Sequence, residues 1–265
     1  MSYENIPKDA DGKVDIAPKD YFIEAAQGNI TGTLDDRIVG RCLTISNVLK
    51  HTLWDFGGDV TYLTADTQLY GSSDSAADTA VILLVQGLDD NYNQTSAIVT
   101  LNGQTQVALS GLLFRVHAII VGNGTNTPLG NVYIAEADTL TAGKPDTQAK
   151  VKGMVELDPK DSGEFASYNI SHNGFFTVPA GKSMHVLGLF NTTEKNCDIE
   201  LDLRARVPGG AWLSLNTIWA YQSPVPLGYL QKPRISEKSD VEMRVISGNA
   251  GGSFEGNVQF VLIDN

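Results

Sequence analysis

The fold is decided by the stretch Val81-Ile-Leu-Leu-Val-Gln-Gly-Leu-Asp-Asp-Asn-Tyr-Asn93, which is followed after a short gap by Ser96-Ala-Ile-Val-Thr-Leu-Asn-Gly103. The first part is almost continuously apolar and predicts a buried strand, and the Gly, Asp and Asn residues after it predict a turn. The second part alternates and predicts another strand, which ends in an Asn102-Gly103 hairpin turn. This combination is typical of an antiparallel β-sandwich. It contains no nucleophile, general base or set of metal ligands.

The rest of the chain repeats this pattern of short strands and turns. Residues Asp198 to Val207 alternate strictly, with Ile199, Leu201 and Leu203 on one face and charged residues on the other. A strand with one buried and one solvated face has this pattern. Roughly twelve strands and almost no helix predict an all-β fold, an antiparallel two-sheet β-sandwich in the form of a jelly roll. We expect one such domain over residues 51–265.

Residues 1–50 differ from this pattern and predict an extended N-terminal arm. The start, Met1 to Lys19, is polar, and Pro7 and Pro18 prevent regular strand pairing. Between Asp35 and Lys50 the apolar residues have mixed spacings, which leaves a short helix and a strand both open. We favour an arm that docks on a neighbouring subunit over a disordered tail. The expected subunit contacts of the arm are Tyr3, Ile6, Val14, Ile16, Tyr21, Phe22 and Ile23.

Charge and hydropathy limit the partners. The formal net charge is -12, and no Lys/Arg cluster is present to neutralise phosphates, so we expect no nucleic-acid binding. No apolar run approaches the length of a membrane span, so we expect that the protein does not bind or cross a membrane. The first residues lack the basic and apolar regions of a signal peptide, which predicts synthesis in a cytoplasm. Free thiols at Cys42 and Cys197 are then favoured, while a disulfide between them stays open.

The sequence shows no pattern that predicts catalysis or a metal site. Asp9 to Asp15 begins like a calcium loop but lacks its later Glu. Asp89 to Asn93 offers oxygen ligands for Ca²⁺, but we favour an Asx-rich turn that satisfies its own backbone. No nucleophile elbow or phosphate-binding Gly loop occurs, so we expect no enzyme, no catalytic residues, no cofactor and no metal. The four histidines stand in no metal-binding spacing and are His51, His117, His172 and His185.

Trp212, Trp219 and Tyr221 form the one notable aromatic group. Aromatic side chains near loops can stack on sugars, so a carbohydrate-binding face is one interpretation. Packing in the core or at a subunit contact is the favoured one, because Trp and Tyr are common core fillers and interface anchors. We therefore add these three residues to the expected subunit interface.

Several segments resemble a family of virion structural proteins of tailed bacteriophages, including marine and cyanobacterial ones. The resemblance covers roughly residues 54–265 and leaves residues 1–50 without a counterpart. Its motifs are turn and strand sequences, so they indicate kinship better than role. The segments are Tyr62-Leu-Thr-Ala-Asp-Thr-Gln-Leu-Tyr70, Val85-Gln-Gly-Leu-Asp-Asp-Asn-Tyr-Asn93 with Val99-Thr-Leu-Asn-Gly103, Phe176-Thr-Val-Pro-Ala-Gly-Lys182 and Val261-Leu-Ile-Asp-Asn265.

The resemblance implies a non-enzymatic particle component. A jelly roll with an N-terminal arm is similar to capsid cement or decoration proteins, which sit on the shell as trimers. We therefore expect a virion protein that binds the major capsid protein or other virion proteins, forms a homo-oligomer with a trimer favoured, and reinforces the head. The alternative is a tail-associated appendage that binds a receptor or a glycan.

Overall fold

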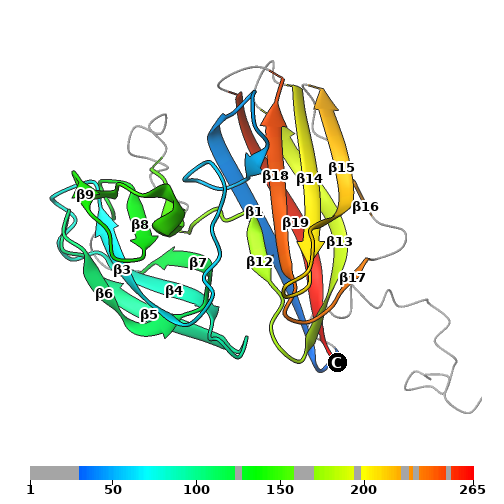
Figure 1. The fold of residues 1–265 in the computed structure, drawn as a ribbon, viewed down its shortest axis with the longest axis horizontal. Helices are drawn as coiled ribbons and strands as arrows, with labels where there is room; N and C mark the ends of the chain where they lie inside the picture. The colour runs from blue at the N-terminus through cyan, green and yellow to red at the C-terminus, as the bar shows by residue number, and fades with distance from the viewer. Residues whose placement is uncertain are drawn as a thin grey trace, which may run out of the picture.

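The computed structural model describes residues 30–122, 127–157, 170–193, 198–221, 227–228, 233–248 and 252–265. These residues form two β-domains that lie side by side (Figure 1). In every sheet the paired strands are antiparallel. The all-β fold with antiparallel sheets packed as a sandwich, predicted from the sequence, is thus confirmed.

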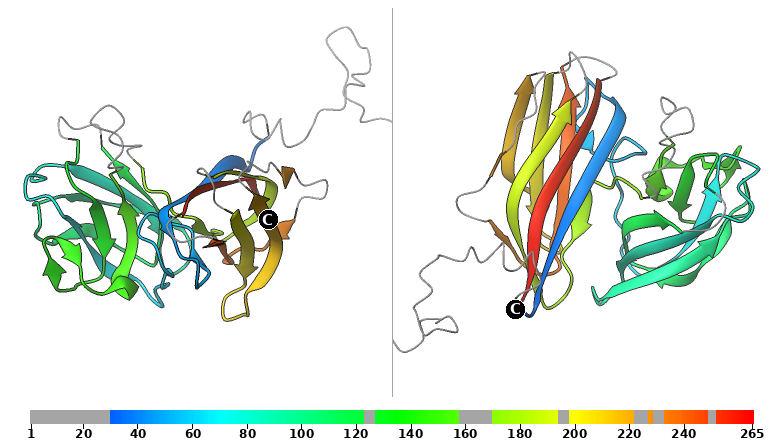
Figure 2. Two further views of the ribbon diagram at one scale, coloured as in Figure 1. Left: turned by 90° about the horizontal axis from the view of Figure 1, so that it is seen from above. Right: turned by 180° about the vertical axis from the view of Figure 1, so that it is seen from behind.

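The larger domain is a jelly roll of two facing sheets (Figures 1 and 2). When β2 and β12 are counted as one strand, the order along the chain is 1-8-3-6 in one sheet and 2-7-4-5 in the other, which is the order of a jelly roll. One sheet has the order β1 (Thr33–Ile45), β19 (Gly252–Asp264), β13 (Lys182–Thr193) and β16 (Leu227–Gly228), with β17 (Arg234–Ile235) also paired to β13. The other has the order β12 (Phe175–Thr177), β18 (Asp240–Ser247), β14 (Asp198–Arg206) and β15 (Leu213–Tyr221), with β2 (His51–Thr52) also paired to β18.

The core of the jelly roll lies between these sheets, and β14 shows how the sequence builds it. Ile199, Leu201 and Leu203 are fully buried, while the charged residues between them are partly exposed. The alternation predicted for this strand is confirmed. The residues meet Val186 from β13 and Phe260 from β19 in one hydrophobic cluster. Burial of such side chains contributes roughly 1.5–3 kcal/mol each, so this cluster stabilises the two sheets as a pair.

The second domain is an insert of residues 54–173, between β2 and β12. It has its own hydrophobic core, which includes Leu83, Val99, Leu113 and Ile119. Two sheets surround this core, in the orders β11-β8-β3-β6 and β5-β4-β7. The strands are β3 (Thr67–Ser73), β4 (Ile82–Leu88), β5 (Gln94–Thr100), β6 (Val107–Leu113), β7 (Arg115–Val121), β8 (Val132–Ala135) and β11 (Val151–Val155); β9 (Leu140–Thr141), β10 (Lys144–Pro145) and the 3₁₀ turn η2 (Gln148–Lys150) join β8 to β11.

The presence of two hydrophobic cores differs from the single β-sandwich domain that the sequence predicts over residues 51–265. Strand patterns report which residues are buried, but they do not report which sheet a strand joins. The Asn102-Gly103 turn illustrates this. Gly103 has a positive φ of 57°, and Asn102 pairs with Thr105 across the turn. The flanking strands β5 and β6 nevertheless belong to different sheets.

The described part of the predicted arm is also structured differently from the expectation. Residues 33–45 form β1, which pairs along β19 from Thr33 opposite Ile263 to Ile45 opposite Gly252. Ile38, Cys42 and Ile45 are buried in the core of the jelly roll, so these residues belong to the sandwich. The mixed apolar spacing reflects a strand with a register shift between Cys42 and Ile45. Residues 1–29 lie outside the described part of the chain.

The chain leaves the jelly roll for the insert and returns to it at the same place in the sheet, next to β18. β2 and β12 both pair with β18, at Arg244 and Val245 and at residues 240–242 respectively. Between them, the Leu53 amide donates to the Met243 carbonyl (2.9 Å), and the Met243 amide donates to the Gly174 carbonyl (2.7 Å). The Gly174 amide donates to the Leu53 carbonyl (2.8 Å), which closes the break. β2 and β12 are therefore two halves of one strand that hosts the insert at its middle.

Glycines make this junction possible. A Cβ at Gly174 would lie 2.1 Å from the Leu53 carbonyl oxygen, and one at Gly40 of β1 would lie 2.6 Å from the same atom. Because both contacts are with backbone, they have no flexible side chain that can move away. Only residues without a Cβ allow the two ends of the insert and β1 to approach this closely.

We expect Gly174→Ala to lower the free energy of unfolding by about 3 kcal/mol or to prevent folding, because it forces Leu53 and β12 apart. Gly111→Ala is the matched control, since a Cβ there meets only the Ala97 Cβ at 3.9 Å. Urea unfolding followed by near-ultraviolet circular dichroism measures both. Equal stabilities of the two variants would contradict the proposed role of the junction.

Candidate functional site

A buried network of charged and aromatic side chains joins the insert to the jelly roll, and we call it the junction network. Asp240 of β18 is its centre. One carboxylate oxygen of Asp240 accepts hydrogen bonds from Arg115 Nε of β7 (3.2 Å) and Thr177 Oγ1 (2.7 Å), and the other accepts one from Arg206 Nε (3.0 Å). The Asp240 and Arg115 side chains are only 6% and 9% exposed. The network comprises Thr52, Tyr62, Arg115, Thr177, Arg204, Arg206, Trp212, Asp240 and Glu242.

Glu242 forms a second pair next to Asp240 on β18. Its carboxylate accepts a hydrogen bond from Arg204 Nη2 at 2.8 Å and another from the Thr52 hydroxyl. The Glu242 side chain is 2% exposed. A buried carboxylate without partners is strongly destabilising, so these hydrogen bonds are what make burial of both acids tolerable.

Two aromatic rings cover the arginines. The Trp212 ring lies 4.2 Å from the Arg204 guanidinium carbon and 4.4 Å from that of Arg206. The Tyr62 ring contacts Trp212 and lies 5.0 Å from the Arg115 guanidinium carbon. Each cation–π contact of this kind contributes about 0.5–2 kcal/mol, more where water is excluded. Burial raises the pKa of Tyr62 well above its ordinary value, so the covering hydroxyl stays neutral.

A second ionic group fixes the two ends of the insert to β1. Asp55 is fully buried and accepts a hydrogen bond from Arg41 Nε of β1 at 3.1 Å. Its other oxygen accepts the backbone N–H of His172 at 3.0 Å and lies 3.3 Å from His172 Nδ1. Asp55 follows the start of the insert and His172 precedes its end. One carboxylate therefore holds both connecting segments on the jelly roll.

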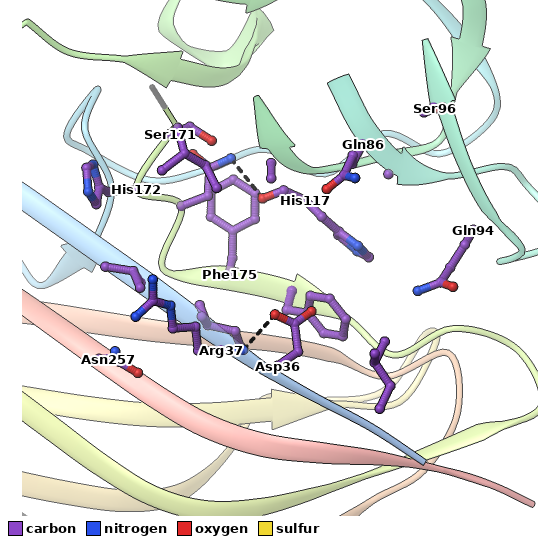
Figure 3. Close-up of a pocket in the computed structure, with 18 of the residues that line it drawn as sticks. Asp36, Arg37, Gln86, Gln94, Ser96, His117, Ser171, His172, Phe175 and Asn257 are labelled. Atoms are coloured by element: carbon purple, nitrogen blue, oxygen red, sulfur yellow. Dashed lines mark hydrogen bonds between the residues drawn. The ribbon is translucent and has the colours of Figure 1, made fainter. Parts of the chain in front are cut away.

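A cleft of about 690 Å³ separates the insert from β1 and β19 on one side of this junction (Figure 3). Gln86, Gln94 and His117 line it from the insert, and Asp36 and Arg37 line it from β1 (Figure 3). Its lining is mostly amide, hydroxyl and aliphatic groups. Such a surface offers hydrogen bonds to a partner, and Asp36, Arg37 and Glu255 add fixed charges to it.

His117 has a structural role, because both its ring and one ring nitrogen contact neighbouring residues. Its Nε2 accepts the backbone N–H of Thr177 at 3.1 Å, and its ring stacks on Phe176 at 4.2 Å. Burial, aided by the charge of Arg115, lowers the pKa of His117 to about 3. The imidazole is therefore neutral at pH 7, and its accepting nitrogen is occupied.

The predicted aromatic group is divided by the structure. Trp212 belongs to the junction network, whereas Trp219 on β15 is 57% exposed and faces solvent. The side chain of Tyr221 lies outside the described residues, as do Tyr3, Ile6, Val14, Ile16, Tyr21, Phe22 and Ile23. A subunit contact through these residues remains a prediction.

The predicted Asx turn is confirmed. Asp89 Oδ1 accepts the backbone N–H groups of Asn91 (2.9 Å) and Asn93 (2.8 Å), and these bonds lower the pKa of Asp89. Cys42 is a buried free thiol whose pKa burial raises to about 11, and Cys197 lies outside the described part. Among the described residues no cluster of three His, Cys, Asp or Glu is placed to hold a metal ion. No helix there is long and apolar enough to cross a membrane.

Sequence reasoning missed the central residues of the junction network. The alternation of residues 198–207 predicts a solvated face for the charged residues, which include Arg204 and Arg206. The signal that was available is the charge of Arg115 inside the run Leu112 to Val121, because an unpaired arginine is rarely buried. Its partner Asp240 lies 125 residues away, and local pattern cannot supply that pairing.

Comparisons with known proteins add little to this geometry. No family model and no curated protein matches the sequence. Among solved structures, the chain is similar to "Structure of infectious bursal disease virus Gx strain", at 10% identity and a TM-score of 0.22, over 88% of this chain and 70% of that chain. It is also similar to "Crystal structure of infectious bursal disease virus VP2 subviral particle", at 10% identity and a TM-score of 0.22, over 94% and 78%. Similarity this low carries no argument about fold or function.

We expect Arg115→Met to lower the free energy of unfolding by about 3 kcal/mol, because it leaves Asp240 buried with one cation fewer. Lys182→Met is the control, since the Lys182–Asp264 pair is exposed and contributes less than about 1 kcal/mol. Urea unfolding measures the difference between the variants. Similar losses in both would mean that Arg115 does not secure the junction.

The lowered pKa of His117 predicts an acid-dependent loss of stability. The native state holds the neutral ring, whereas the unfolded state takes up a proton below about pH 6.5. The contribution is therefore present above pH 6.5 and is lost as the pH falls towards 3. Because the ring is partly open to the cleft, we expect this loss to reach only on the order of 2 kcal/mol at pH 4.

His117→Gln keeps an acceptor for the Thr177 amide but does not titrate. The stability difference between wild type and this variant should shift in favour of the variant between pH 7 and pH 4. Thermal melts at the two pH values measure it, and a difference independent of pH would rule out the titration of His117 as a source of acid sensitivity.

Proposed function

We propose that this chain is a non-enzymatic structural protein of a tailed-bacteriophage virion, and more specifically a decoration or cement protein that reinforces the head. The observation that carries the proposal is the junction network. Arg115 and Tyr62 of the insert contact Asp240, Arg206 and Trp212 of the jelly roll across the boundary between the two β-domains, and the remaining ion pairs of the network hold these jelly-roll residues in place. Charged groups that pair with one another in this way hold the insert and the jelly roll in one arrangement. A component of a virus shell requires such rigidity.

The proposed mechanism uses the protein as a rigid two-domain block. The split strand and the junction network prevent the insert from turning against the jelly roll, because any rotation would separate buried charges. Two domains set side by side reach further than one sandwich (Figure 1), so the block can touch more than one neighbour. Several contacts made at once raise the overall affinity well above that of each contact alone.

The partners follow from the sequence resemblance. We propose the major capsid protein or another virion protein as the binding partner, and a homo-oligomer of this chain, with a trimer favoured, as the bound form. The N-terminal residues before β1 are the proposed docking segment. The protein is made in the host cytoplasm and reaches the virion by assembly.

The test is a truncation that the structure now defines. Deleting residues 1–50 would remove β1 and part of the core, so the informative variant lacks only residues 1–29. We expect it to fold with unchanged thermal stability and to lose binding to particles that lack the protein. Full-length protein added to the same particles is the control, and occupancy is read from quantitative mass spectrometry.

The same measurement tests the location. A copy number comparable to that of the major capsid protein is expected for a head protein. A small number of copies per particle would favour the tail-appendage alternative, and unchanged occupancy of the truncated variant would refute docking by the arm.

A further inference from the structure

The cleft between the insert and β1 is bordered by an open strand edge. β1 lies at the end of its sheet, and within the described residues it pairs only with β19. Leu34 and residues 36–39 of β1 line the cleft. Successive residues of a strand point to opposite faces, so a cleft that touches consecutive residues borders the edge of the strand. From Gly40 onward the same edge is covered, because Gly40 lies against Leu53 and Gly174.

Backbone groups on this edge are available for pairing. The Arg37 amide donates to the Oδ1 of its neighbour Asp36 (2.7 Å) and therefore does not bond to β19. In an antiparallel pair, successive residues alternate between bonding to the partner and facing away from it. The register of β1 with β19 is unbroken over residues 33–42, so Arg37 and Val39 both turn their amide and carbonyl groups away from β19. Such an edge pairs readily with another extended backbone.

The chain turns sharply immediately before β1. The Thr33 hydroxyl donates to the Ile30 carbonyl at 2.6 Å, and Gly32 between them has a φ of 80°, as at the third position of a type II turn. The Gly32 carbonyl accepts the Asp264 amide at 2.9 Å, so the β19 side of β1 is already occupied at this point. The side that is open to a chain returning along β1 is the cleft.

We propose that residues 24–29 of this chain bind in the cleft as an added strand, antiparallel to the open edge of β1. A hairpin closed at the observed turn pairs Ala26 with Arg37 and Glu24 with Val39. The added strand covers an edge that folded proteins rarely leave exposed. An extended backbone matches this edge better than a compact small molecule does, because its N–H and C=O groups repeat at the spacing of a strand.

The segment and the opposite wall of the cleft suit each other. The segment Glu24-Ala-Ala-Gln-Gly-Asn29 contains no proline, so each of its amides can donate a hydrogen bond, and most of its side chains are short. In the proposed register Glu24 stands diagonally across from Arg37, which has the opposite charge. Across the cleft, Gln86 and Gln94 present side-chain amides that can pair with the other edge of the strand (Figure 3).

The added strand is compatible with the proposed function but does not depend on it. Residues 1–23 stay outside the strand and remain the docking segment. Residues 24–29 are poor strand formers with little apolar surface, so the strand opens locally without unfolding either core. Its removal therefore leaves the thermal stability unchanged, as expected above for the variant that lacks residues 1–29, and hydrogen exchange is the sensitive measurement.

Proline substitutions test the strand and its register. In this register the Ala26 amide donates to Arg37, whereas the Ala25 amide faces away from β1. We expect Ala26→Pro in the full-length chain to speed hydrogen exchange of the Val39 amide at least tenfold, measured by NMR. Ala25→Pro is the matched control and should exchange as wild type does, because a strand tolerates proline where the N–H points away from its partner. Equal exchange in wild type and Ala26→Pro, or equal acceleration by both variants, would overturn the proposal.

A cysteine pair tests which chain supplies the strand. Gln27 stands opposite Asp36 in the proposed register, so Gln27→Cys combined with Asp36→Cys should form a disulfide within one chain under mild oxidation. Ala26→Cys combined with Asp36→Cys is the control. Its two side chains lie on opposite faces, so its disulfide should form at least tenfold more slowly. Non-reducing electrophoresis and peptide mapping measure both.

Two results of the cysteine experiment would contradict the proposal. A disulfide between two chains would show that another copy occupies the cleft, and equal rates for the two pairs would show that no strand of this register forms. Neither the exchange nor the disulfide measurement uses a virus particle, so the proposed function is tested separately.

Discussion

The structure depends on one broken strand. β2 and β12 occupy a single position opposite β18, and the chain leaves at Leu53 and returns at Gly174 through hydrogen bonds that the two residues share with Met243 and with each other. Because the ends of the insert meet within one ladder, a domain of more than a hundred residues adds no gap to the jelly-roll sheet. The requirement for close backbone approach explains why Gly40 and Gly174 stand there.

The junction network fixes the orientation of the insert relative to the jelly roll. A strand break alone would leave the insert attached by two backbone segments, which can bend. The pairing of Arg115 with Asp240 and of Arg41 with Asp55 places buried charges on both sides of the boundary. Buried ion pairs add little net stability over apolar packing, but separating the partners is costly, so they favour one relative arrangement over others. The mechanical role proposed above follows from this asymmetry.

Local features of the chain could be predicted, and long-range ones could not. The alternation of β14 and the Asp89 turn depend on neighbours within a few residues, and both were confirmed. Residues 33–45 were assigned to an arm because their register shift blurs the strand period, and only the pairing with β19 reveals a core strand. The site was the hardest to predict. Arg115 and Asp240 are joined by the fold, and Trp212 covers arginines that sequence alone placed in water.

The sequence by itself determined that this is an all-β chain, where most of its strands and turns lie, and that its charge is strongly negative. These properties are set by the period of apolar residues, by Gly, Asn and Asp at turns, and by composition. The tertiary structure alone decided that the strands divide between a jelly roll and an insert, that Arg115 meets Asp240, and that Asp55 contacts both Arg41 and the His172 amide. The physical reason is that packing between segments far apart in the chain determines which strands pair. The alternation of apolar residues within a strand does not show which partner it has.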